Sequence, residues 1–150
     1  MLVIFLVVVA AAAGVGGLFT ARSVGTWYRE LNRPGWTPPG WLFSPVWTAL
    51  YVMMAIAAWR VWMVAGAKAP AALTAFVIQL VLNAGWSAIF FGLRRPGWAF
   101  AELSALWVAI VVTTVLFARR SVLAAVLMAP YLAWTTFAGA LNFTIWRMNV

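Results

Sequence analysis

The 150-residue chain contains no cysteine and no histidine, and its only acidic residues are Glu30 and Glu102. Without cysteine it forms no disulfide and offers no thiolate. Without histidine it lacks the commonest metal ligand and the commonest general base of proteins. Metal sites need several such side chains at defined spacings, and none can be drawn from this set. We therefore predict no metal site and no acid–base pair for ordinary hydrolysis.

Charge of either sign is also scarce. Only 8% of the residues are charged, whereas 67% are hydrophobic and the mean hydropathy is +1.01. A soluble domain is about half apolar, and a membrane-spanning helix needs about 20 mostly apolar residues. The composition predicts an integral, multi-pass membrane protein whose residues 1–150 form one all-α domain. Its expected architecture is a five-transmembrane-helix bundle with a long ordered first loop.

Apolar runs place the five spans. The first carries no Lys or Arg before its apolar stretch and exceeds a signal-peptide core in length, so we expect it to be retained. The small residues of this first span either form a face that lets another helix approach closely, or they merely fit tight packing within the bundle. Pro45 suits the first turn of the second span. Pro130 lies inside the fifth span, where it should kink the helix or free a carbonyl. The predicted spans are 1–21, 43–64, 70–93, 98–118 and 122–146.

The segment 22–42 combines charge, proline, glycine and aromatic residues. Its prolines prevent a regular helix, and a loop this long is usually functional or disordered. Aromatic side chains argue against disorder. We expect an ordered loop, with a short helix near 27–31, that lies against one mouth of the bundle. The residues behind this expectation are Trp27, Tyr28, Pro34, Trp36, Pro38, Pro39 and Trp41.

The net charge of +8 arises from basic residues that stand one or two at a time between apolar runs. That pattern orients helices and contacts anionic membrane lipid, and it argues against nucleic acid as a partner. The long loop, the turn at 94–95 and the C-terminus carry six arginines, against three basic residues in the turns on the other side. The positive-inside rule then predicts a cytoplasmic loop and C-terminus, if the membrane is a bacterial inner membrane.

Three spans carry stripes of aromatic and polar side chains at helical spacing. Facing inward, these stripes would line a mostly apolar cavity with a few polar anchors, as small-molecule sites do. The alternative is that the amides and hydroxyls only join helices to each other. The stripes are Trp47, Tyr51 and Met54; Gln79, Asn83, Trp86 and Phe90; and Tyr131, Trp134, Ala138 and Asn142.

Three runs resemble the TspO family, also called the tryptophan-rich sensory protein, translocator protein or peripheral-type benzodiazepine receptor family. They are WYRELNRPGWTPPGWLFSPVWTALY (27–51), QLVLNAGWSAIFFG (79–92) and PYLAWTTFAGALNFTIWRMN (130–149). The resemblance implies a five-helix bundle, often a homodimer, with a ligand cavity beneath the first loop. Family members bind porphyrins, cholesterol and benzodiazepine-type ligands. Bacterial members are linked to stress-responsive regulation of tetrapyrrole metabolism, and some are reported to degrade porphyrin in light.

The resemblance and the stripes together predict the site residues. Tyr28 and Trp134 match the aromatic residues of the family's porphyrin chemistry. Ala84 departs from a tryptophan that often follows the asparagine, which predicts a differently shaped pocket. Phe143 stands where the sterol consensus of animal members has tyrosine. The expected ligand-binding residues are Trp36, Trp41, Trp47, Tyr51, Asn83, Trp86, Phe90, Trp134, Ala138 and Asn142.

The missing histidine and cysteine bear on how a tetrapyrrole is held. They are the usual axial ligands of haem, and only tyrosine or methionine remains. We expect no required cofactor, and a porphyrin or haem bound as ligand by stacking. The leading function is a membrane receptor or sensor of porphyrin-type tetrapyrroles. The alternatives are a light-dependent porphyrin-degrading enzyme, with Tyr28 and Trp134 as its reactive residues, and a porphyrin or sterol transporter.

Overall fold

The computed structural model describes residues 1–150, which form helices and connecting turns and contain no strand. Five of the helices are long and apolar enough to cross a membrane, as the sequence predicts. The chain is therefore an all-α, multi-pass membrane protein. In order, the elements are α1 (Leu2–Ser23), α2 (Trp27–Glu30), α3 (Gly40–Ala65), the 3-10 turn η1 (Gly66–Lys68), α4 (Pro70–Ser87), the π-helix η2 (Ala88–Gly92), α5 (Pro96–Ala118) and α6 (Val122–Met148).

Contacts between the five long helices arrange them in a ring whose order differs from their order in the chain. Helix α1 packs against α3 and α4, α3 packs against α6, and α5 lies between α6 and α4. Helix α1 is the least buried member, since only Val9, Gly16 and Ser23 are buried along its length. At one end of the ring, side chains fill the interior. At the other end, they line a space that remains open.

The filled end lies away from the long loop. Helix α3 contributes a run of fully buried residues, several of them alanines, and short side chains let neighbouring helices approach closely. Larger side chains fill the remaining space, with the Phe76 and Phe117 rings stacked at 5.9 Å. The centre of this core consists of Met54, Ala55, Ala57, Ala58, Val61, Phe76, Ile110, Phe117, Met128 and Tyr131.

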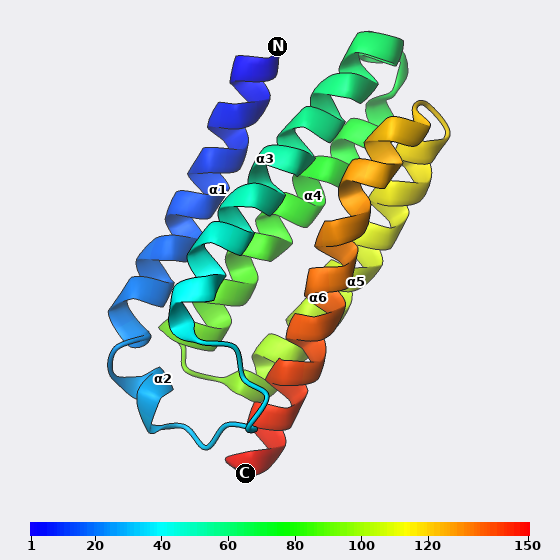
Figure 1. Ribbon diagram of the computed structural model, residues 1–150. Coiled ribbons are helices and arrows are strands. Elements are labelled where there is room, and N and C mark those ends of the chain that lie inside the picture. Colours follow the sequence, from blue (N-terminus) through cyan, green and yellow to red (C-terminus); the bar gives the residue numbers. More distant parts are fainter.

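Hydrogen bonds fix the two ends of the bundle. At one end Arg120 donates to the Lys68 carbonyl at 3.0 Å and joins the α5–α6 turn to the α3–α4 connection. At the other end the Asn149 amide donates to the Asn32 carbonyl at 2.8 Å, and its oxygen accepts from the Asn32 N–H at 3.0 Å. Figure 1 shows the long loop and the C-terminus together at this second end, opposite the N-terminus.

The start of α3 corrects one sequence expectation. Pro45 was expected in the first helical turn, but α3 already begins at Gly40 and Pro45 lies inside it. The cause is Pro39, whose extended conformation (φ −61°, ψ 144°) ends the loop directly before the helix. Pro45 has no N–H to donate to the carbonyl of Trp41, so one early helical hydrogen bond is lost. The short helix expected near 27–31 is present as α2.

The end of the third span contains a π-helical turn that hydropathy does not predict. Residues Ala88–Gly92 are π-helical, and the Leu93 N–H donates to the Ala88 carbonyl at 2.8 Å. The wider turn leaves both Phe90 and Phe91 buried. The Phe91 carbonyl accepts a hydrogen bond from the Ser23 hydroxyl at 2.6 Å. π turns inside helices are rare and occur often at functional sites.

Candidate functional site

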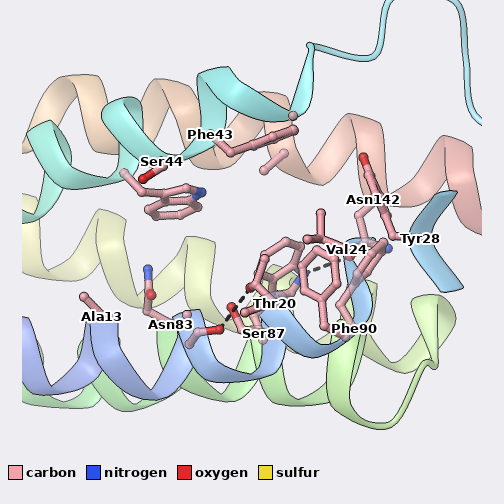
Figure 2. Close-up of a pocket in the computed structure, with 18 of the residues that line it drawn as sticks. Ala13, Thr20, Val24, Tyr28, Phe43, Ser44, Asn83, Ser87, Phe90 and Asn142 are labelled. Carbon is pink, nitrogen blue, oxygen red and sulfur yellow. Dashed lines mark hydrogen bonds between the residues drawn. The ribbon is translucent and has the colours of Figure 1, made fainter. Parts of the chain in front are cut away.

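A cavity of about 470 Å³ occupies the loop end of the ring. Its walls come from α1, α2, the first half of α3, the end of α4 with η2, and the second half of α6. Small-molecule sites usually measure about 300–1,000 Å³ and are mostly apolar. The lining here is also mostly apolar, and no charged side chain contributes to it. Figure 2 shows Phe43 and Ser44 of α3 on one side of this space and Ala13 and Thr20 of α1 on the other.

Most of the residues expected at a ligand site line this cavity. Each of the three stripes predicted from helical spacing contributes to the lining, and α2 adds Tyr28. Met54, Gln79 and Tyr131, which also belong to the stripes, are buried in the core and do not line the cavity. Trp36 of the loop and Trp41 at the start of α3 do not line it either. Trp36 is 50% exposed and packs edge-on against Phe137, and Trp41 is 73% exposed. The expected residues that line the cavity are Tyr28, Trp47, Tyr51, Asn83, Trp86, Phe90, Trp134, Ala138 and Asn142.

A chain of hydrogen bonds crosses three helices at the inner end of the cavity. The Tyr51 hydroxyl of α3 donates to the Asn83 oxygen of α4 at 2.6 Å. The Asn83 amide donates to the Tyr131 hydroxyl of α6 at 2.8 Å, and that hydroxyl donates to Gln79 at 2.7 Å. Every link is satisfied within the protein, so this network stabilises the arrangement of α3, α4 and α6. The network residues join helices, and two of them, Tyr51 and Asn83, also line the cavity, so the two interpretations of the stripes apply together.

A second amide performs the same task near the loop. Trp86 donates its indole N–H to the Asn142 oxygen at 2.9 Å, and the Asn142 amide donates to the Pro96 carbonyl at 2.8 Å. This links the end of α4, the start of α5 and α6. The Trp86 indole therefore has a fixed orientation, with its ring stacked on Phe90 at 5.3 Å. A ligand in the cavity meets the Trp86 ring, whose indole N–H is already engaged.

Aromatic rings gather on two sides of the cavity. The first group, which we call the lid cluster, is Trp27, Tyr28, Phe90 and Phe91, with ring centroids 4.8–6.2 Å apart. The second, the wall cluster, is Phe43, Trp47, Tyr51 and Trp134, with centroids 5.7–6.4 Å apart. Aromatic rings at such separations attract each other and stiffen the surface that they form. The cavity is thus bounded by two preorganised aromatic surfaces.

Tyr28 connects the lid cluster to the charged loop. Its side chain is buried, and the Arg33 guanidinium lies over the ring, 4.9 Å from the centroid. Burial raises the pKa of Tyr28 above its ordinary value, and the hydrogen bond and charge of Arg33 offset part of that rise. The hydroxyl is therefore neutral at physiological pH. The cation over the ring adds a stabilising contact between the loop and α2.

One wall of the cavity was not among the expected site residues. Helix α1 contributes Ala13, Gly16, Gly17 and Thr20. The only sequence signal was the spacing of small residues, which fits close packing equally well. Gly16 does pack closely, because a Cβ there would lie 3.2 Å from the Ser87 oxygen, whereas Gly17 has nothing within 4 Å. Helix α1 is thus closely packed at Gly16 and lines the cavity at Gly17. Ala84, which was expected to change the shape of the pocket, is not among the lining residues.

Comparison with known proteins gives a consistent result across the chain. The model of the TspO/MBR family matches residues 3–147. The tryptophan-rich protein TspO of Chlorobaculum tepidum is 43% identical over 141 residues, which is 93% of this chain and 89% of that protein. The human translocator protein is 41% identical over 138 residues, covering 90% and 82%. The tryptophan-rich sensory protein of Cereibacter sphaeroides is 38% identical over 145 residues, covering 97% and 89%.

Proposed function

The chain belongs to the TspO/MBR family, and from that membership and the geometry of the cavity we propose that it is a membrane receptor or sensor that binds a porphyrin-type tetrapyrrole. The observation that carries the proposal is the pair of aromatic clusters on two sides of one apolar cavity. A flat, conjugated ring gains from contact with aromatic faces. The relative named as a tryptophan-rich sensory protein supports a sensory role.

The donor set around the cavity determines how such a ligand is held. No histidine or cysteine exists in the chain, and no methionine lines the cavity. Among the lining residues only Tyr28 and Tyr51 carry phenol groups, and Tyr51 donates to Asn83. The cavity therefore offers few side chains that could serve as axial ligands of iron. We propose that stacking and apolar contact hold the ring, so that metal-free porphyrin binds about as well as haem.

Titration of the protein in lipid nanodiscs with protoporphyrin IX and with haem, followed by tryptophan quenching, tests this proposal. The two dissociation constants should agree within a factor of about three, a difference below ~1 kcal/mol. Trp134→Ala should weaken both by about tenfold, since an aromatic contact contributes about 0.5–1.5 kcal/mol beyond its area. Trp98→Ala is the matched control, because Trp98 is 69% exposed and does not line the cavity.

Two outcomes would contradict the proposal. Equal losses of affinity in Trp134→Ala and Trp98→Ala would place the ligand outside the cavity. A haem Soret shift of the kind produced by strong axial coordination, together with much tighter binding of haem than of metal-free porphyrin, would show ligation that stacking does not explain.

One observation favours a light-dependent enzyme as the second candidate. Tyr28 and Trp134, which are both oxidisable, line the same cavity from the lid cluster and the wall cluster. Illumination of the pure protein with protoporphyrin in air tests it. Loss of macrocycle absorbance that disappears in Trp134→Phe supports the enzyme, and loss at the rate of free porphyrin refutes it. For the transporter alternative the helices offer no inverted repeat, since the spans number five.

A further inference from the structure

The exposed residues of the cavity lining lie on only two helices. They are Gly17 and Ala21 of α1, and Gly40, Ser44 and Thr48 of α3, whereas the lining residues of α4, η2 and α6 are buried or half-buried. The cavity is therefore open between α1 and α3. We call these five residues the α1–α3 portal. All of them are small and none is charged, so the opening is not obstructed by long side chains.

The water-facing end of the cavity is closed in the same structure. Tyr28 is 6% exposed, and the lid cluster packs directly above the cavity. The Ser23 hydroxyl holds the end of α1 to the Phe91 carbonyl. The two hydrogen bonds between Asn32 and Asn149 attach the loop to the end of α6. A ligand that entered from water would have to break this packing, whereas the portal needs no rearrangement of the loop.

The depth of the portal indicates what passes through it. Gly40 begins α3, and Thr48 lies eight residues further along the helix, which corresponds to about 12 Å at 1.5 Å per residue. Half of a bilayer's hydrocarbon core is about 15 Å thick. The portal thus opens within the leaflet on the loop side, from the headgroup boundary down to the acyl chains. Ser44 and Thr48 place hydroxyl groups along one edge of an otherwise apolar opening.

We propose that the ligand enters and leaves the cavity sideways, from the loop-side leaflet through the α1–α3 portal, without passing through water. The matching ligand class is a planar amphiphile that partitions into the bilayer, its ring among the acyl chains and its polar groups at the headgroup level. This proposal rests on the proposed function, because it takes the cavity as the binding site. Helix α1 has the fewest buried residues of the five helices and is therefore held by the least packing. It is the helix that moves aside when a wide ligand passes.

Two glycines of α1 provide a matched test. Gly14 and Gly17 are both exposed, and a Cβ added to either meets nothing within 4 Å, but only Gly17 lines the cavity. Stopped-flow binding of protoporphyrin IX is measured in phosphatidylcholine–phosphatidylglycerol vesicles. Gly17→Phe should slow both association and dissociation by about tenfold, since both directions use one opening. Gly14→Phe should leave both rates at the wild-type value.

Two further measurements make the test independent of any change in affinity. With the free aqueous protoporphyrin concentration held fixed, the share of phosphatidylglycerol in the vesicles is varied to change how much ligand partitions into the bilayer, and the association rate should follow the mole fraction of ligand in the bilayer. In Asn149→Ala, which releases the loop, the rate should stay unchanged. A rate that follows free aqueous ligand, or one that rises in Asn149→Ala, overturns sideways entry in favour of entry past the loop. Absence of equilibrium binding in the wild type would instead overturn the proposed function itself.

Discussion

Three asparagine side chains join parts of the molecule that are distant in the sequence. Asn83 links α3 to α6 through two tyrosine hydroxyls, Asn142 links α4 to the start of α5, and Asn149 attaches the loop to the end of α6. A side-chain amide suits this task because it donates and accepts at once. In an apolar surrounding such bonds are strong, and leaving a partner unpaired is costly.

Removing the central amide should therefore destabilise the bundle more than removing a peripheral hydroxyl. Asn83→Ala leaves the hydroxyls of Tyr51 and Tyr131 without one partner each. We expect the free energy of unfolding to fall by about 2–3 kcal/mol, because unsatisfied buried groups cost about 1–3 kcal/mol. Tyr51→Phe, which removes only the end of the chain, should cost about 1 kcal/mol. Thermal unfolding in one detergent compares them, and equal losses would show that the network does not act as a unit.

Glu102 is the acidic side chain that lies within a span. It sits on α5 against Gly85 of α4, where an added Cβ would lie 3.0 Å from its Oε1 atom. Its other oxygen, Oε2, is buried without a hydrogen-bond partner. Burying an unpaired carboxyl is unfavourable, so Glu102→Leu should raise the free energy of unfolding by about 1 kcal/mol or more. Thermal unfolding measures this, and a lower midpoint would show that the carboxyl has a stabilising role.

At the scale of elements, hydropathy predicts what depends on local composition and misses what depends on neighbours. The five spans follow from their apolar runs, and the convergence of Trp47, Asn83 and Trp134 follows from helical spacing. The early start of α3 depends on the conformation of Pro39. The π-helical turn depends on partners from another helix, since Ser23 bonds to the carbonyl of Phe91. No pattern within 88–92 alone contains that information.

The contribution of α1 to the cavity is a similar case. Its small residues predict close packing, and Gly16 is indeed closely packed. At Gly17 the same kind of residue faces open space and lines the cavity. Which glycine packs and which one lines depends on how α1 sits against α3 and α4, so the spacing could not distinguish them. The exposed position of Trp36 likewise depends on the path of the loop, and that of Trp41 on where α3 begins.

The contact between α1 and η2 gives a prediction for the element. A Cβ at Gly92 would lie 2.7 Å from the Phe19 ring, so Gly92→Ala forces the ring or the π turn to move. Overpacking of this kind costs about 1–3 kcal/mol. Gly14→Ala is the matched control, because its Cβ meets open space, and it should be neutral or stabilise by up to about 1 kcal/mol. Chemical unfolding in detergent separates the two, and equal midpoints would exclude tight α1–η2 packing.

The loop offers a second prediction at this scale. Asn149→Ala removes both hydrogen bonds between the C-terminus and Asn32. The loop should then be cleaved faster by trypsin at Arg29, because cleavage requires local opening. Thr144→Ala is the control, since the Thr144 hydroxyl bonds only to its own helix at Ala140. Unchanged cleavage in Asn149→Ala would mean that the lid cluster alone holds the loop in place.

The whole molecule has two chemically different ends. The long loop, the turn at 94–95 and the C-terminus lie at one end, and η1 and the α5–α6 turn lie at the other (Figure 1). The excess of arginine at the loop end predicts that this end faces the cytoplasm. Because the chain has no cysteine, single variants can be labelled without background. In intact bacterial cells an impermeant maleimide should label Lys68→Cys but not Gly35→Cys, and the reverse pattern would invert the orientation.

The ring order of the helices has a consequence for biosynthesis. Helix α3 follows α1 in the chain, yet its other main partner is α6, the last helix to be made. Its contact with α4 runs through side chains, such as the hydrogen bond from Tyr51 to Asn83. While the ribosome is still producing α5, the first three spans therefore surround no enclosed space. The cavity comes into existence when α6 inserts between α3 and α5. A nascent chain interrupted before residue 122 thus has spans in the bilayer but lacks the wall of the cavity that α6 supplies through Trp134, Ala138 and Asn142.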